Sequence, residues 1–202
     1  QIKDLKGQIL VSTHSPIIVA QVELKDIIHI SKKQNASTIN KIDVSGLAAQ
    51  DGIRKVKQED LNTRGDLLFA NAIILCEGET EEQSLPKFFR KHFGYEAFEL
   101  GVNIISVGGS GKYYPFLRVA KDLNIECFIL SDGEQETIKK VKKDLKKVWG
   151  EEKAEEKLSR YVKFLPNGND FEGYLIEEGY IKEIEKAIDC LHGEGFIEDY
   201  IV

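Results

Sequence analysis

Residues 72–81 read Ala-Ile-Ile-Leu-Cys-Glu-Gly-Glu-Thr-Glu, and this stretch decides the class of fold. Its first five residues are apolar and a glycine follows soon after, which predicts a short buried strand at residues 72–76. Residues 80–93 then carry Thr80 and Gln83 at the spacing of a capping box and predict a helix. The apolar residues on one face of that helix are Leu85, Phe88, Phe89 and Phe93. A buried strand that leads directly into an amphipathic helix favours an α/β fold.

The same alternation of strand and helix continues towards the carboxyl terminus. Strands are predicted at residues 102–107, 127–131 and 161–165, and helices at residues 114–123 and 138–148. This order predicts a mostly parallel sheet flanked by helices.

The amino-terminal part is rich in strands instead. Strands are predicted there at residues 8–12, 26–31 and 38–44. Residues 46–66 show no strand pattern and contain Gly52 and Gly65, which favours a junction. We therefore expect two units, residues 1–66 and residues 67–202.

The composition excludes several classes of protein. Hydrophobic residues make up 42% of the 202 residues and charged residues 31%, which is typical of a soluble globular domain. The apolar runs are too short to cross a bilayer, so we expect no membrane partner. Three cysteines without paired spacing favour a reducing compartment, and hence the cytoplasm. The chain begins with Gln1 and contains no Met, so we expect it to be part of a longer protein.

The net charge of −6 hides a difference between the two predicted units. Residues 1–66 carry 10 Lys and Arg against 8 Asp and Glu, whereas residues 67–202 carry 18 against 26. An acidic unit that binds nucleic acid needs cations between its carboxylates and the phosphates. The positions of these carboxylates therefore matter more than the net charge.

Acidic pairs follow three of the predicted strands. They are Glu77 with Glu81, Asp132 with Glu134, and Asp170 with Glu172. Since the carboxyl ends of parallel strands meet at one edge of a sheet, these side chains are expected to converge. Converging carboxylates repel one another unless a cation lies between them, and oxygen ligands suit Mg²⁺ or Mn²⁺ rather than zinc.

A plainer interpretation exists for each charged feature. Acidic residues favour helix starts, so any single pair is explained by a solvated turn. Three pairs at successive strand ends favour a metal site instead. The lysine-rich helix at residues 138–148 suggests contacts with phosphates, but a solvated outer face is the favoured interpretation, because acidic residues follow it at 151–156.

The residues also resemble a known domain. Glu77-Gly78-x-Thr80-Glu81 after a hydrophobic strand, with Asp132-x-Glu134 after a later one, resembles the Toprim domain of topoisomerases, primases and certain nucleases. The second acidic motif of that domain is usually Asp-x-Asp, so Glu134 departs from the pattern. The lead-in, Gly-Asp-Leu-Leu-Phe-Ala at residues 65–70, and Val-Gly-Gly at residues 107–109 resemble the overcoming lysogenization defect (OLD) family of nucleases.

A second resemblance lies near the amino terminus. Residues 9–16 read Ile-Leu-Val-Ser-Thr-His-Ser-Pro, similar to the last motif of the ABC-type ATPase domain that precedes Toprim in the OLD family. The resemblance implies that His14 senses the γ-phosphate of a nucleotide. The residues themselves indicate only a histidine before a helix that Ser15 caps and Pro16 opens. The resemblance further implies homodimerisation through the ATPase part.

The chain itself lacks a phosphate-binding P-loop. Residues 108–112, Gly-Gly-Ser-Gly-Lys, imitate part of one, but Ser106 stands where the first glycine is needed and Tyr113 where the hydroxyl ligand of Mg²⁺ is needed. We therefore expect ATP to act only through the missing ATPase core. The glycine-rich turn is expected to border the acidic site, with Lys112 contacting a phosphate.

These features together predict a two-metal DNA endonuclease. We expect Glu77, Asp132 and Glu134 to hold one ion, and Glu81 with Asp170 or Glu172 to hold the other. The resemblance also makes Glu77 a general acid or base and implies a further catalytic lysine. Only Lys182 and Lys186 follow the third acidic pair, on a predicted amphipathic helix, so we expect that lysine to lie beyond Val202 and the Toprim unit to be truncated.

Other functions remain open at this point. The domain could be a non-catalytic Toprim scaffold in DNA recombination or repair, in which case its carboxylates would be dispensable. It could belong to a topoisomerase, although no tyrosine lies in a suitable context. An α/β phosphoacceptor domain would instead be phosphorylated on Asp132. The OLD resemblance implies a role in phage defence or DNA repair.

Overall fold

The centre of the molecule is a four-stranded parallel sheet. The computed structural model describes residues 7, 9–33, 35–44, 65–109 and 112–192. The strands are β3 (Ala72–Cys76), β4 (Val102–Ser106), β5 (Glu126–Ser131) and β6 (Val162–Phe164). Their spatial order is β4-β3-β5-β6, and all three pairings are parallel. The predicted α/β class with a parallel sheet is confirmed.

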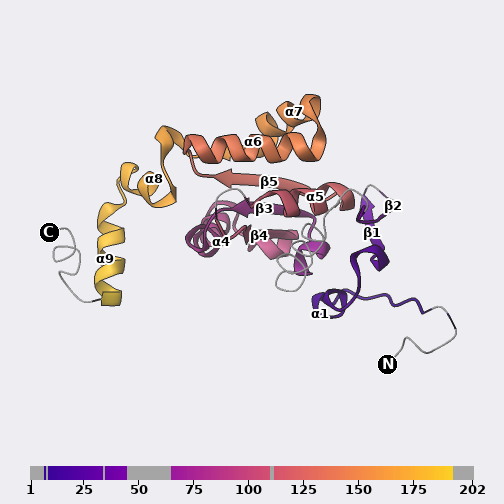
Figure 1. The fold of residues 1–202 in the computed structure, drawn as a ribbon. Helices are drawn as coiled ribbons and strands as arrows, with labels where there is room; N and C mark the ends of the chain where they lie inside the picture. The colour runs from indigo at the N-terminus through magenta and orange to yellow at the C-terminus, as the bar shows by residue number, and fades with distance from the viewer. Residues whose placement is uncertain (1–6, 8, 34, 45–64, 110–111, 193–202) are drawn as a thin grey trace.

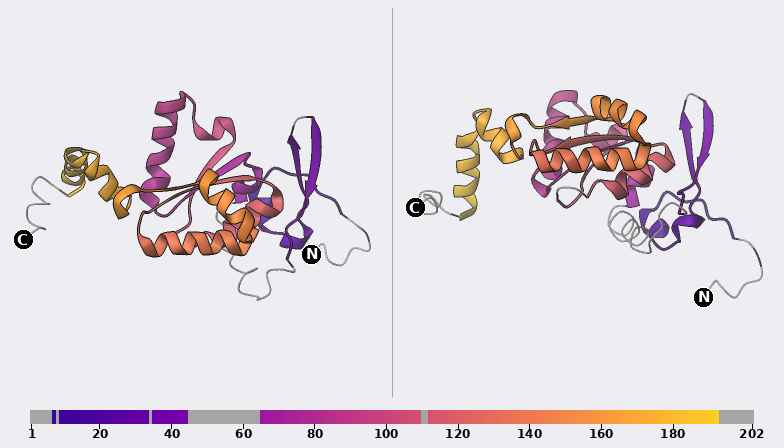
Figure 2. Two further views of the ribbon diagram at one scale, coloured as in Figure 1. Left: turned by 90° about the horizontal axis from the view of Figure 1, so that it is seen from above. Right: turned by 45° about the horizontal axis from the view of Figure 1, so that its top comes forward.

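Helices cover both faces of this sheet. The helices after β3 are α4 (Glu79–Phe93), α5 (Tyr114–Leu123), α6 (Gln135–Trp149), α7 (Glu151–Tyr161), α8 (Phe171–Glu177) and α9 (Ile181–His192), and 3₁₀ turns lie at η3 (Gly65–Phe69), η4 (Ala97–Leu100) and η5 (Pro166–Gly168). Of these, α8 and α9 extend beyond the carboxyl ends of the strands instead of covering a face (Figure 1). The chain moves from β3 to β4 in one direction across the sheet, and from β4 to β5 and β6 in the other. Because parallel crossovers are right-handed, α4 and α5 must cover opposite faces. Figure 2 accordingly shows α4 and α6 on opposite sides of the strands.

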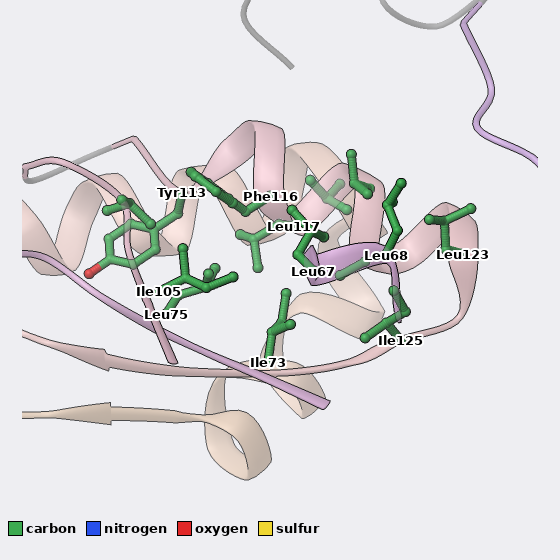
Figure 3. Packing of buried hydrophobic residues seen from close by; sticks show 14 of the residues in the cluster. Leu67, Leu68, Ile73, Leu75, Ile105, Tyr113, Phe116, Leu117, Leu123 and Ile125 are labelled. Atoms are coloured by element: carbon green, nitrogen blue, oxygen red, sulfur yellow. The ribbon is translucent and has the colours of Figure 1, made fainter. Parts of the chain in front are cut away.

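The main core lies between the sheet and α5. Ile73 and Leu75 of β3 are fully buried, since every second residue of a strand points to the same face. Phe116 and Leu117 of α5 cover them, and Leu67 of η3 closes one side (Figure 3). This packing holds the carboxyl ends of β3 and β5 side by side.

The amino-terminal segment is packed against the same core. It consists of α1 (Pro16–Ala20), the 3₁₀ turn η1 (Leu24–Asp26) and the antiparallel hairpin β1 (His29–Lys33) and β2 (Ala36–Asn40). Leu24 and Ile42 are buried in the core cluster. Arg118 of α5 pairs with Asp43 at 3.0 Å and with Asp122 at 3.1 Å, which fastens this segment to α5.

Three strand predictions in this segment need correction. Residues 9–12 form no strand, and Ile9, Leu10 and Val11 are exposed. A strand requires a neighbour for its backbone groups, and no strand among the described residues pairs with this run. The other two strands form, but displaced from residues 26–31 and 38–44 to β1 and β2. Residues 41–44 run along α5 instead, where the backbone N–H of Asp43 donates to Asp122 at 3.0 Å.

The helix predictions differ from the structure in smaller ways. α4 begins at Glu79 with Gly78 as its N-cap, so Thr80 is not the capping residue. Phe88 and Phe93 are about half exposed, so the predicted apolar face of α4 is only partly buried. Residues 151–161 form α7, for which no helix is predicted from the sequence.

Two further observations concern predictions about surfaces. On α6, Lys139 pairs with Glu136 at 2.8 Å and Lys146 with Glu151 at 2.7 Å, as expected for a solvated face. Within the described residues, no helix combines the length and apolar character that crossing a bilayer requires. The predicted junction at residues 46–66 lies almost wholly outside the described residues.

Candidate functional site

The strand order places the acidic residues at one point of the sheet. β3 lies next to β5, with Leu75 opposite Ile129, so Glu77 and Asp132 leave neighbouring strands at the same edge. The chain's direction across the sheet reverses between β3 and β5. In open α/β sheets, ligands bind in the crevice beyond such a reversal.

Glu77 is the most tightly held residue at this edge. The residue is 5% exposed, and its Oε1 accepts three hydrogen bonds. The donors are the hydroxyl of Ser131 at 2.7 Å, the backbone N–H of Asp132 at 3.2 Å and the hydroxyl of Tyr113 at 3.3 Å. Its other oxygen, Oε2, accepts no hydrogen bond from the residues that the structure describes.

The backbone of Glu77 is anchored as well. Its carbonyl oxygen accepts hydrogen bonds from the hydroxyl of Ser106 at 3.0 Å and from the backbone N–H of Gly109 at 2.9 Å. The end of β4 and the glycine-rich turn therefore fix the main chain at the point where β3 ends. Gly108 and Gly109 both have positive φ angles, 72° and 116°, which glycine adopts without strain.

Glu81 is buried in the first turn of α4. Its Oε1 accepts a hydrogen bond from the backbone N–H of Gly78 at 3.4 Å, which is half of a capping box. Capping thus directs this carboxylate back towards the strand end that carries Glu77, as predicted from the spacing of the two residues.

The pKa of Asp132 responds to the other carboxylates at this edge. Burial raises the pKa of its carboxyl group to about 7, and the carboxylates of Glu77, Glu81, Asp170 and Glu134 add to the shift. This response identifies the residues that the fold brings together. They are five of the six predicted metal ligands.

A close backbone approach brings the third acidic pair to this edge. The backbone N–H of Gly133 donates to the carbonyl of Asn169 at 2.8 Å. A Cβ atom at Gly133 would collide with the carbonyl oxygen of Leu165, so only glycine fits. Asp170 is exposed, and its Oδ1 accepts from the backbone N–H of Gly173 at 2.7 Å, which caps α8.

Not every predicted site residue belongs to this group. Glu172 is exposed in the first turn of α8 and does not act on Asp132. Lys112 bends back, and its Nζ donates to the carbonyl of Gly108 at 2.7 Å, so it lies at the rim of the turn. The neighbouring residues 110 and 111 lie outside the described residues.

His14 belongs to the amino-terminal segment and not to the acidic edge. It is exposed just before α1, whereas the strands point their carboxyl ends towards α8 (Figure 1). Pro16 opens α1 as predicted, but the side chain of Ser15 makes no capping hydrogen bond. The backbone N–H of Ser15 donates to Oγ1 of Thr13 at 3.0 Å.

The donor chemistry of the edge fits a hard divalent cation. Every candidate ligand is a carboxylate oxygen, which is the donor type that Mg²⁺ and Mn²⁺ prefer. In the described part of the chain, however, no three acidic, histidine or cysteine side chains surround a single point closely enough to hold a metal. Exposed Glu134 and Asp170 are the side chains with room to move inward.

Sequence reasoning missed the hydroxyl groups around Glu77. Tyr113 is fully buried, and burial raises the pKa of its hydroxyl well above the ordinary value, so it remains a donor. Ser131 and Ser106 are buried as well. The sequence signal that could have found them is their position: Ser131 ends β5, Ser106 ends β4 and Tyr113 directly precedes α5. All three positions adjoin the crevice that contains Glu77.

A parallel sheet in this order, with carboxylates beyond β3 and β5, defines an α/β domain of the Toprim type. Residues 68–133 match the family model described as "Overcoming lysogenization defect protein-like, TOPRIM domain". This part of the chain is therefore an OLD-like Toprim domain, as its motifs indicated.

Two known proteins resemble the chain more widely. It is 24% identical over 128 residues to the Old nuclease of Escherichia phage P2, an alignment covering 62% of this chain and 22% of that protein. The chain thus spans about a fifth of that relative's length. The C-terminal region of the OLD protein of Xanthomonas campestris pv. campestris matches with a TM-score of 0.53 and 23% identity, covering 64% of this chain and 65% of that one. This likeness supports the fold.

Proposed function

We propose that the acidic edge is a nuclease centre that hydrolyses phosphodiester bonds of DNA with the help of Mg²⁺ or Mn²⁺. The observation that carries this proposal is the group of five carboxylates at the edge where the chain's direction across the sheet reverses between β3 and β5. The charged groups that raise the pKa of Asp132 are all carboxylates. The OLD-like Toprim match and the similarity to a protein named Old nuclease support the same class of activity.

The ligands divide between two ions in this proposal. Glu77, Asp132 and Glu134 would hold one ion, and Glu81 with Asp170 the other. Glu172, which is exposed in the first turn of α8, remains the alternative ligand from the third pair. When bound, the two cations stabilise the attacking and leaving oxygens of an in-line displacement and lower the pKa of a water molecule.

The protein contributes fixed geometry to this chemistry. Glu77 and Glu81 are held by hydrogen bonds from backbone and hydroxyl groups, so their carboxylates have fixed orientations. Asp132 and Asp170 adjoin them from the next strand end and from the start of α8. Lys112, whose Nζ now donates to the carbonyl of Gly108, would contact a phosphate of the substrate after releasing that carbonyl.

Nicking of supercoiled plasmid by the longer parent protein tests this proposal, since the further catalytic lysine is expected beyond Val202 and the 202-residue chain alone is expected to cleave poorly. With Mn²⁺ present, the wild-type parent protein is expected to nick DNA, and Asp132→Ala and Glu77→Ala are expected to lose at least about a hundredfold in rate. Glu155→Ala, an exposed carboxylate on α7, is the matched control and should keep the wild-type rate. Equal nicking by wild type and both site variants would contradict the proposal.

The alternative function, a non-catalytic scaffold, predicts that the carboxylates do not bind metal. If the Toprim unit only supports other domains, calorimetric titration with Mg²⁺ or Mn²⁺ will give no heat that depends on Asp132. For the longer parent protein, we further propose ATP control and homodimerisation through an ATPase part, with His14 contacting the nucleotide. Light scattering with and without ATP tests that assembly.

A further inference from the structure

We propose that Tyr113 and Ser131 are positioning residues that aim a single oxygen of Glu77, Oε2, at the metal. This inference rests on the proposed function, since it names how the same site presents one ligand. Of the two roles expected of Glu77, this inference keeps that of a metal ligand and drops that of a general acid or base.

The hydrogen-bond pattern carries this inference. All three donors to the Glu77 carboxylate converge on Oε1, at 2.7, 3.2 and 3.3 Å. A carboxylate oxygen has two lone pairs, so three donors leave Oε1 no capacity for a cation. Only Oε2 remains available among the described contacts, which makes Glu77 a monodentate ligand.

The burial of the donors gives the arrangement its rigidity. Tyr113 is 0% exposed and Ser131 is 1% exposed, so neither hydroxyl has water as an alternative partner. Turning the Glu77 carboxylate away would break the hydrogen bonds that these two buried hydroxyls donate to it, which costs free energy. The carboxylate is therefore locked in one orientation before any ion arrives.

The donors also come from separate parts of the fold. Tyr113 precedes α5, Ser131 ends β5, and Ser106 and Gly109 hold the carbonyl of Glu77 from the end of β4 and the turn beyond it. Ligand orientation by such outer partners affects metal affinity in proteins by about 10–100-fold. Tyr113 contributes a hydroxyl only, so Tyr113→Phe removes the donor while keeping the ring that fills the core.

The experiment measures Mn²⁺ binding to the full 202-residue chain by electron paramagnetic resonance of the free ion, beside thermal unfolding without metal. Tyr113→Phe and Ser131→Ala are each expected to weaken Mn²⁺ binding about tenfold. Ser131→Thr keeps a hydroxyl and is expected to restore most of the affinity. Tyr114→Phe makes the same chemical change one residue away, where the ring faces Lys147, and should bind as wild type does.

A double-mutant cycle separates positioning from a merely structural role. In a Glu77→Ala background, Tyr113→Phe is expected to have no further effect on Mn²⁺ binding, because the carboxylate that it orients is gone. An equal effect in both backgrounds would overturn the positioning role while leaving the metal site intact. Absence of Mn²⁺ binding by the wild-type chain would overturn the proposed function, and the positioning role with it.

Discussion

Among single residues, Gly133 constrains the site most sharply. It lies between Asp132 and Glu134, and its missing side chain lets the end of β5 touch the backbone that follows β6. The contact places Asp170 beside Asp132 although the two are far apart in sequence. The lack of a side chain at Gly133 thus allows the pair Asp132 and Glu134 to lie beside the pair Asp170 and Glu172.

Substitution of this glycine is expected to separate them. In Gly133→Ala, the new Cβ would press against the carbonyl of Leu165 and the backbone of Gly168, neither of which can rotate away. Overpacking of this kind costs about 1–3 kcal/mol of unfolding free energy. Urea denaturation measures the loss, and Gly7→Ala, which meets no atom within 4 Å, serves as the control. An unchanged midpoint in Gly133→Ala would show that the close approach does not exist in solution.

His29 predicts how stability depends on pH. Its Nδ1 is buried without a hydrogen-bond partner among the described residues. Burial lowers the pKa of its imidazole, although the backbone of Leu68 acts in the opposite direction. The unfolded chain therefore binds a proton more readily, near pH 6.5, than the folded chain does.

Folding free energy contributed by His29 is consequently lost as the pH falls below about 6.5 and through its folded pKa. Unfolding measured by urea at pH 7.5 and 5.5 is expected to lose less stability between these values in His29→Gln than in wild type. His92→Gln, an exposed histidine of α4, controls for the change in charge. A wild-type pH dependence that His29→Gln leaves unaltered would contradict this account.

Which residues could be predicted from sequence follows from their chemistry. Glu77, Glu81 and Asp132 could be predicted, because charged residues directly after apolar runs mark the ends of strands. Tyr113 could not be, since an aromatic residue before a helix is usually ordinary core. Its role depends on a hydrogen bond that spans 36 positions of the sequence, and local patterns carry no such information.

At the level of helices and strands, α8 connects capping with the acidic site. Asp170 is its N-cap, accepting a hydrogen bond from Gly173, while its charge also acts on Asp132. One side chain therefore serves a local structure and a long-range electrostatic group. A substitution that keeps the capping oxygen but removes the charge separates these two roles of Asp170.

Asp170→Asn keeps an oxygen acceptor for the cap but removes the charge. It is expected to retain wild-type stability and to weaken Mn²⁺ binding, whereas Asp170→Ala should also lose about 1 kcal/mol of unfolding free energy. Thermal unfolding and titration with Mn²⁺ measure the two effects. If Asp170→Asn bound Mn²⁺ as tightly as wild type, Asp170 would not be a ligand, and Glu172 would become the candidate.

Elements with strong internal patterns were predictable, and elements defined by their neighbours were not. β3 and α5 have the predicted boundaries, since apolar runs and helical periodicity are local properties. The apolar run at residues 9–12 resembles β3 in composition, yet it forms no strand because no described strand lies beside it. Composition alone cannot distinguish the two cases.

Across the whole molecule, the clustered carboxylates repel one another and lower the stability of the metal-free fold, although the proposed metal site requires them. Five acidic side chains meet at one edge, and Asp132 is partly buried among them. Without metal at pH 8, Asp132→Asn is expected to unfold at a higher temperature than wild type, because it removes a repelled charge.

Addition of Mn²⁺ should reverse that order. Ligands that bind only the folded state stabilise it by mass action, so wild type is expected to gain in melting temperature and Asp132→Asn to gain less. Differential scanning calorimetry over a series of Mn²⁺ concentrations checks both halves. Glu155→Gln, remote from the edge, should follow wild type throughout. A more stable wild type in the absence of metal would refute the repulsion.

The long separation between Glu77 and Asp170 along the chain has a consequence during synthesis. Ribosomes add roughly 5–20 residues per second, so residue 170 is made on the order of 5–20 s after residue 77. In the first part of that interval, the strand that carries Glu77 exists without β5 and Gly133, and until its end it exists without the start of α8. A nascent chain therefore cannot assemble the acidic edge until most of the domain has been translated.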